Sequence, residues 1–179
     1  MKTIRSIQSL FLLIMMLFSL NAFSAAENTF SDAAITAAVK SKIMLNTSIA
    51  NYNVEVTTNN GVVNLNGRVN TDTEASAIIE LAESTSGVKD VDASRLEVKD
   101  SKQPLTDTVI TSKVKGTFIR EKLFSEKDIA AMSIKVETNN GIVALSGTAA
   151  NQQEVDNAIA LAKAVNGVKS VTSQIKIAQ

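Results

Sequence analysis

The sequence Asn-Asn-Gly-Val-Val-Asn-Leu-Asn-Gly at residues 59–67 decides the fold, because it occurs twice. It recurs at a spacing of 80 as Asn-Asn-Gly-Ile-Val-Ala-Leu-Ser-Gly at residues 139–147. A second motif, Ser-Gly-Val-Lys-Asp-Val at residues 86–91, recurs at the same spacing as Asn-Gly-Val-Lys-Ser-Val at residues 166–171. Two motifs repeated at one spacing indicate an internal duplication. The Asn-Asn-Gly step predicts a tight turn between two strands.

The sequence around each turn predicts the same order of elements. Apolar residues at intervals of four precede each turn and predict an amphipathic helix; they are Ile35, Val39 and Ile43, and Ile110, Val114 and Phe118. Strict alternation of polar and apolar residues at 53–57 and 133–137 predicts a strand, which the returning strand follows after the turn. A second helix that ends at a glycine and a final strand complete each copy. The order is therefore αββαβ, twice.

The predicted fold class is α+β, with two tandem domains that each hold a small three-stranded mixed sheet and two helices on one face. We place the first domain at residues 31–99 and the second at 106–179. A polar linker at 100–105 joins them and holds the single proline of the chain. The second copy carries five extra residues around 125–131. Each copy is small for a hydrophobic core, so the two domains could also pack on each other.

The first 26 residues have the pattern of a secretory signal peptide. Two basic residues precede an apolar run at 10–18, and small residues follow, with cleavage after Ser24 or after Ala26. An uncleaved anchor is the alternative, although the run is shorter than the roughly 20 residues of a spanning helix. A chain without Cys cannot carry a lipid on a cysteine. We therefore expect a periplasmic protein with no lipid anchor and no transmembrane helix in its mature form.

The composition argues against catalysis. The chain has no Cys and no His, which excludes thiol nucleophiles, His-based acid–base catalysis and His or Cys metal ligands. Seven carboxylates are candidate acid–base groups, but their spacing in the sequence does not bring any two of them close together. They are Glu55, Glu74, Glu80, Glu83, Asp90, Asp92 and Glu97. We expect no enzyme, no metal and no cofactor. Few aromatic residues and a slightly acidic mature chain also argue against nucleic acid as a partner.

The repeated motifs resemble those of the BON domain family. The residues that carry the resemblance are Asp32, Ile35, Val39, Gly61, Val63, Leu65, Gly67, Gly87, Val88 and Val91, and in the second copy Asp107, Ile110, Val114, Gly141, Val143, Leu145, Gly147, Gly167, Val168 and Val171. The resemblance implies a non-catalytic role in the cell envelope, with phospholipid binding, osmotic or envelope stress, or chaperone-like help to exported proteins. Six motif glycines have a sufficient backbone role in turns and caps: Gly61, Gly67, Gly87, Gly141, Gly147 and Gly167.

A binding surface is predicted at the first helix of the second copy. Residues 106–179 hold nine basic and seven acidic residues, whereas residues 31–99 hold six and nine. Basic and apolar side chains alternate along this helix in a way that suits an anionic lipid surface; they are Lys113, Lys115, Phe118, Ile119, Arg120, Lys122, Leu123 and Phe124.

Two alternatives to lipid binding by this helix are also considered. It can be an ordinary solvated face, with Phe118 aligned to Ile43 and placed in the core. The protein can also act as a chaperone or adaptor that offers apolar patches or a sheet edge to exported or outer-membrane proteins. The expected partners are thus membrane phospholipids, held weakly and peripherally, or exported client proteins. We expect a monomer.

Overall fold

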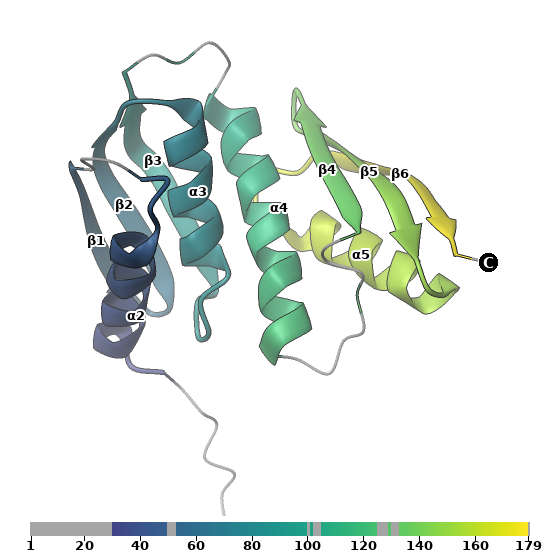
Figure 1. Cartoon of the computed structure of the whole chain (residues 1–179), viewed down its shortest axis with the longest axis horizontal. Coiled ribbons are helices and arrows are strands. Elements are labelled where there is room, and N and C mark those ends of the chain that lie inside the picture. The colour runs from purple at the N-terminus through teal and green to yellow at the C-terminus, as the bar shows by residue number, and fades with distance from the viewer. Residues whose placement is uncertain are drawn as a thin grey trace, which may run out of the picture.

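Two helices and three strands form each half of the chain (Figure 1). The computed structural model describes residues 30–49, 53–99, 101, 105–124, 129 and 133–178. The first half contains α2 (Asp32–Leu45), β1 (Asn53–Asn59), β2 (Val62–Val69), α3 (Asp72–Glu83) and β3 (Asp90–Val98). The second half contains α4 (Leu105–Phe124), β4 (Ile134–Asn139), β5 (Ile142–Ala149), α5 (Gln152–Ala164) and β6 (Ser170–Ile177).

Each half builds a mixed sheet from its three strands. The strand orders are β1-β2-β3 and β4-β5-β6, in which the first pair is antiparallel and the second pair is parallel. The registers match between the halves, since Val56 pairs with Leu65 as Val136 pairs with Leu145. The helix between the second and third strands provides the crossover that a parallel pair needs. The predicted α+β fold with two tandem mixed sheets is confirmed.

The turns between the antiparallel strands have the conformation that Asn-Asn-Gly predicts. Asn60 and Gly61 both have positive φ, 51° and 82°, and so do Asn140 and Gly141. A carboxylate from the preceding helix holds each turn. Asp32 accepts hydrogen bonds from the backbone N–H of Asn60 and of Gly61, at 2.8 and 2.9 Å.

The second half repeats this clamp with Asp107, which accepts from Asn140 and Gly141 at 2.7 and 2.9 Å. The aspartate of the motif therefore does more than favour the start of a helix. It ties the helix to the hairpin, which fixes the helix across one face of the sheet.

The second helix of each half begins with a reciprocal cap. The side chain of Thr71 accepts from the backbone of Glu74, and Glu74 Oε2 accepts from the N–H of Asn70 at 2.8 Å. In α5 the side chains of Asn151 and Glu154 make the same pair of bonds. Both glutamates are buried, because their carboxylates satisfy backbone N–H groups at the helix end.

Each half has its own hydrophobic core between its helices and its sheet. The apolar stripe of α2 is fully buried, as are the inward positions of β1 and β2, whereas Glu55 and Thr57 on the other face are exposed. The second core also includes Ile129, which is 0% exposed. The largest fully buried side chains are Phe118, Ile35, Ile43, Leu65, Ile78, Ile79, Leu96, Ile129 and Leu145. The alternating pattern of the sequence thus predicts the inner faces correctly.

The two halves meet through their helices. In Figure 1 the sheets lie on the outer sides of the molecule, and α3 and α4 run side by side between them. Val109 of α4 also packs against the core of the first half. The possibility that the domains pack on each other is therefore realised, with α3 and α4 as the contact.

Parts of the sequence analysis fall outside the described residues. These are the signal peptide at 1–26, residues 100 and 102–104 of the linker, and all of the insertion around 125–131 except Ile129. The helix before the insertion is longer than its counterpart. It ends at Phe124, whereas the position that matches the last residue of α2 is Arg120.

Candidate functional site

The contact between α3 and α4 depends on one glycine. A side chain on Gly116 of α4 would place its Cβ 2.5 Å from Cβ of Glu83 and 2.9 Å from the carbonyl oxygen of Glu80. Atoms in folded proteins do not approach so closely, and neither neighbour is the end of a flexible chain. Gly116 therefore allows the two helices to approach closely, and this approach brings their polar side chains within bonding distance.

Glu83 at the end of α3 is the centre of the contact. Its Oε1 accepts from Nη1 of Arg120 at 2.8 Å and from the hydroxyl of Thr117 at 3.1 Å. Arg120 also donates to the backbone carbonyl of Glu83 at 2.8 Å. The side chains of Glu83 and Arg120 are 4% and 17% exposed, so this ion pair crosses the joint in a largely dry environment.

A second ion pair lies next to the first. Lys113 Nζ of α4 lies 2.5 Å from Oδ1 of Asp90, at the start of β3, and the lysine side chain is 6% exposed. Lys42 of α2 donates to the backbone carbonyl of Ser84, just beyond α3, at 3.0 Å. A carboxylate and a carbonyl of the first domain thus each bind a lysine near the end of α3.

Burial raises the pKa of two carboxyl groups on α3, those of Glu80 and Glu83. The pKa of Glu83 is raised because burial disfavours its charge, although Arg120 and Lys113 oppose the shift. The pKa of Glu80 is raised for the same reason, against the nearby charge of Lys115. The other oxygen of Glu83, Oε2, is buried without a hydrogen-bond partner. Joining the domains in this way therefore includes the cost of dehydrating this carboxylate.

The structure divides the predicted lipid-binding residues into two groups. Lys113 and Arg120 point at carboxylates of the first domain, and Phe118 lies in the core with 1% of its surface exposed. These three side chains do not form part of the outer surface. Ile119 is half-buried.

The other members of the set lie on the outside of α4. Lys115 and Lys122 are exposed, and two large apolar side chains at the end of the helix are also exposed, Leu123 at 65% and Phe124 at 57%. Exposed apolar residues next to lysines are the arrangement that interfacial helices use. We call these four residues, Lys115, Lys122, Leu123 and Phe124, the α4 tip.

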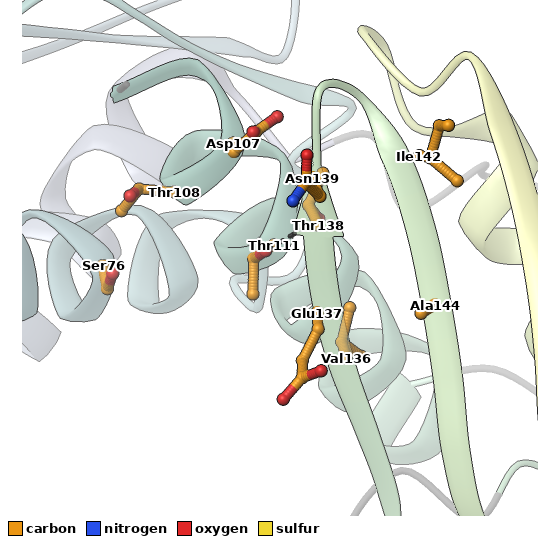
Figure 2. Close-up of a pocket in the computed structure, with 10 residues that line it drawn as sticks. All are labelled: Ser76, Asp107, Thr108, Thr111, Val136, Glu137, Thr138, Asn139, Ile142 and Ala144. Carbon is orange, nitrogen blue, oxygen red and sulfur yellow. Dashed lines mark hydrogen bonds between the residues drawn. The ribbon is translucent and has the colours of Figure 1, made fainter. Parts of the chain in front are cut away.

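A groove of about 480 Å³ lies between the domains on another side of α4. Figure 2 shows Ser76 of α3 and Thr108 and Thr111 of α4 on one side of this groove, and strand β4 on the other. The hydroxyl of Thr111 donates to that of Thr138 at 2.7 Å, which ties the helix to this strand. In the described part of the chain β4 pairs with β5 alone, so its other edge borders the groove with unpaired backbone groups.

Three of the seven carboxylates considered as acid–base groups have a structural role. Glu74 caps a helix and Glu83 and Asp90 bind cations of α4. Two of the seven, Glu74 and Glu83, are buried. No group of three or more potential metal ligands occurs within the described ranges.

Sequence reasoning missed the joint between the domains. Gly116 carries no turn or cap signal, and the sequence motif of the duplication does not include it. A signal was nevertheless present in the differences between the copies. Gly116, Arg120 and Glu83 align with Ser41, Leu45 and Lys163, so the joint lies where the copies have diverged.

No helix within the described ranges is both long enough and apolar enough to cross a bilayer. The apolar run at residues 10–18 lies outside these ranges.

Comparison with known proteins agrees with the duplication. The family model named BON domain matches residues 31–100 and again 106–179. The Osmotically-inducible protein Y of Escherichia coli (strain K12) is 36% identical over 161 residues, which cover 87% of this chain and 77% of that protein. The "Uncharacterized protein in gshII 5'region" of Anaplasma centrale is 26% identical over 82% of this chain and 94% of its own.

Solved structures give a weaker likeness. The C-terminal domain of CdsD, the structural protein of the Type III secretion system of Chlamydia trachomatis, matches with a TM-score of 0.34 and 12% identity, over 84% of this chain and 100% of its own. The family of the chain is therefore shown by the two matched repeats and by the 36% identity to Osmotically-inducible protein Y. The chain belongs to the BON domain family, with two BON domains in tandem.

Proposed function

We propose that the protein is a non-catalytic envelope protein that contacts anionic phospholipid surfaces through the α4 tip. The observation that carries the proposal is the exposure of Leu123 and Phe124 at the end of α4, next to exposed Lys122 and about two turns beyond exposed Lys115. The pattern of residues 1–26 supports export to the periplasm. The name of the relative, Osmotically-inducible protein Y, supports a role in osmotic stress.

The chemistry of the α4 tip suits weak and reversible attachment. Each lysine near an anionic bilayer contributes about 1 kcal/mol. Insertion of the exposed parts of Leu123 and Phe124 adds the transfer of apolar surface from water, about 25 cal/mol for each Å² buried. Two cations and two apolar side chains therefore support association that depends on both salt and anionic lipid.

Flotation of the mature protein with vesicles tests this function. Vesicles of phosphatidylglycerol and phosphatidylcholine are compared with pure phosphatidylcholine, at low and high salt. We expect flotation with the anionic vesicles alone, and release when salt screens the lysines. The double variant Leu123→Ser/Phe124→Ser should release the protein without changing net charge.

A matched control uses another exposed apolar pair, at the end of α2. Met44 and Leu45 at the end of α2 are 72% and 81% exposed, so Met44→Ser/Leu45→Ser removes a similar apolar area from the first domain. Equal flotation of wild type and the α4 variant would show that the α4 tip is not the contact. Loss of flotation in the α2 variant alone would move the contact to the first domain.

The groove beside β4 favours a second candidate function, in which the protein binds extended segments of exported proteins. An extended segment could pair with the free edge of β4 and lie between this strand and Ser76 of α3. Exposed Ile142, at 46%, and the hydroxyls of the groove give such a segment apolar and polar contacts.

A lipid-free aggregation assay tests the second candidate. The protein should slow the precipitation of reduced insulin, and Ser76→Tyr should weaken the effect by filling the groove. Residue Asp156 of α5 is the exposed counterpart of Ser76, so Asp156→Tyr is the control. No protection by excess wild-type protein, or equal protection by both variants, would remove the groove from consideration.

A further inference from the structure

We infer that the first domain limits membrane contact by capping the inner cations of α4 with its own carboxylates, and that an anionic surface competes with this cap. The inference rests on the proposed phospholipid function and concerns the regulation of the same helix. Its basis is the position of Lys113 and Arg120, which belong to the basic helix but bind Asp90 and Glu83 of the other domain.

The cap has the chemistry of the ligand that it excludes. Glu83 binds Arg120 through Oε1 and through its backbone carbonyl, and Asp90 binds Lys113. The oxygens of a lipid phosphate would bind the same guanidinium and ammonium groups. The domain contact and an anionic headgroup cannot hold these two cations at the same time, so each must weaken the other.

The composition of the joint allows it to open. Each domain has a separate hydrophobic core, so separation of α3 from α4 leaves both cores intact apart from the packing of Val109. The contact includes Gly116, Thr117 and the ion pair of Glu83 with Arg120, and Oε2 of Glu83 is buried without a hydrogen-bond partner. Opening would hydrate this oxygen, which offsets part of the cost of breaking the ion pairs. Domains joined by polar contacts are expected to move relative to each other.

A cavity gives solvent access to the cap. It has a volume of about 300 Å³ and is lined by Glu83, Asp90 and Lys89 of the first domain and by Thr117 and Arg120 of α4. The end of α5 closes its other side. The ion pairs thus lie at the edge of the joint, where an approaching anion can begin to replace a carboxylate.

Two variants open the joint by different means. Glu83→Lys places a cation against Arg120 and Lys113, and Gly116→Leu places a side chain where the helices approach most closely, without a change of charge. Glu97→Lys is the control for net charge, because Glu97 is exposed and pairs with Arg68 on the outside. Ser41→Leu is the control for the leucine, at the exposed position of α2 that matches Gly116.

The variants are tested with vesicles of phosphatidylglycerol and phosphatidylcholine, together with small-angle X-ray scattering without lipid. Circular dichroism establishes that each variant is folded. We expect Glu83→Lys and Gly116→Leu to increase the radius of gyration and to bind the vesicles ~10-fold more tightly than wild type, as removal of a competing closed state predicts. Both controls should keep the compact scattering profile, and Ser41→Leu should keep the affinity of wild type.

The possible outcomes distinguish failure of the capping inference from failure of the proposed lipid-binding function. If wild type binds and the opened variants bind no tighter than Glu97→Lys and Ser41→Leu, the cap is refuted and the lipid function stands. If neither wild type nor the opened variants bind, the lipid function fails and the cap fails with it. If both variants remain compact, the contacts at Glu83 and Gly116 do not hold the joint, which also overturns the inference.

Discussion

Removal of the aspartate clamp should destabilise either domain by a similar amount. In Asp32→Ala the N–H groups of Asn60 and Gly61 lose a charged acceptor. Gly61 is buried, so loss of its bond costs about 1–2 kcal/mol, while water can replace the bond of exposed Asn60, at a cost of about 0.5–1 kcal/mol. The lost charge at the start of α2 adds about 0.3–1 kcal/mol. The expected total is about 2–4 kcal/mol.

Urea denaturation followed by circular dichroism measures this loss. Asp107→Ala should lose a similar free energy of unfolding, because its two bonds repeat those of Asp32. For a unit of this size the loss lowers Tm by about 8–30 °C. Asp32→Asn, which keeps one acceptor oxygen, should lose about half as much.

Asp72→Ala provides the matched control for a charge at a helix start. Asp72 is the first residue of α3 and accepts from the exposed hydroxyl of Ser101. Its loss should cost less than about 1 kcal/mol. A loss below about 0.5 kcal/mol for both Asp32→Ala and Asp107→Ala, or an equal loss for Asp72→Ala, would refute the clamp.

Three further predictions concern the joint and the second core. Gly116→Ala should destabilise the docked protein by about 1–3 kcal/mol, because its Cβ overlaps Glu83; a urea midpoint equal to that of wild type would contradict the close approach. Because the pKa of Glu83 is raised, this carboxyl group binds a proton more tightly in the folded protein than in the unfolded chain. Protonation of Glu83 therefore stabilises the folded protein in mild acid. This stabilisation is lost as the pH rises through the raised pKa. The stability of wild type relative to Glu83→Gln should therefore increase from about pH 7 to about pH 4, and a constant difference would show that the pKa is not raised. Ile129→Ala should cost about 2–5 kcal/mol, since this residue is fully buried, and a cost typical of a surface residue would remove it from the core.

The sequence was sufficient to predict the architecture of each domain. The alternation in β1 and β2, the interval of four in α2 and the Asn-Asn-Gly turn each reflect a local backbone rule, and the duplication repeats all of them. Local rules of this kind do not depend on which other segment lies nearby. The elements and their inner faces could therefore be predicted from one copy and checked against the other.

The candidate site was harder to predict because it depends on contacts between the copies. Lys113 and Arg120 have the same sequence signature whether they face water, lipid or a carboxylate. Their partners lie 23 and 37 positions away, in the other domain. Periodicity identifies the helix that carries them but not the surface that covers one of its sides.

The joint between the domains also fixes the order in which the two domains can follow each other. Because α3 of the first unit receives the first helix of the second, the contact has a direction. The reverse order lacks the required groups: Lys163 occupies the position that matches Glu83, and Leu45 occupies the position that matches Arg120. A chain with its halves exchanged would therefore lack the Glu83–Arg120 ion pair that fastens them.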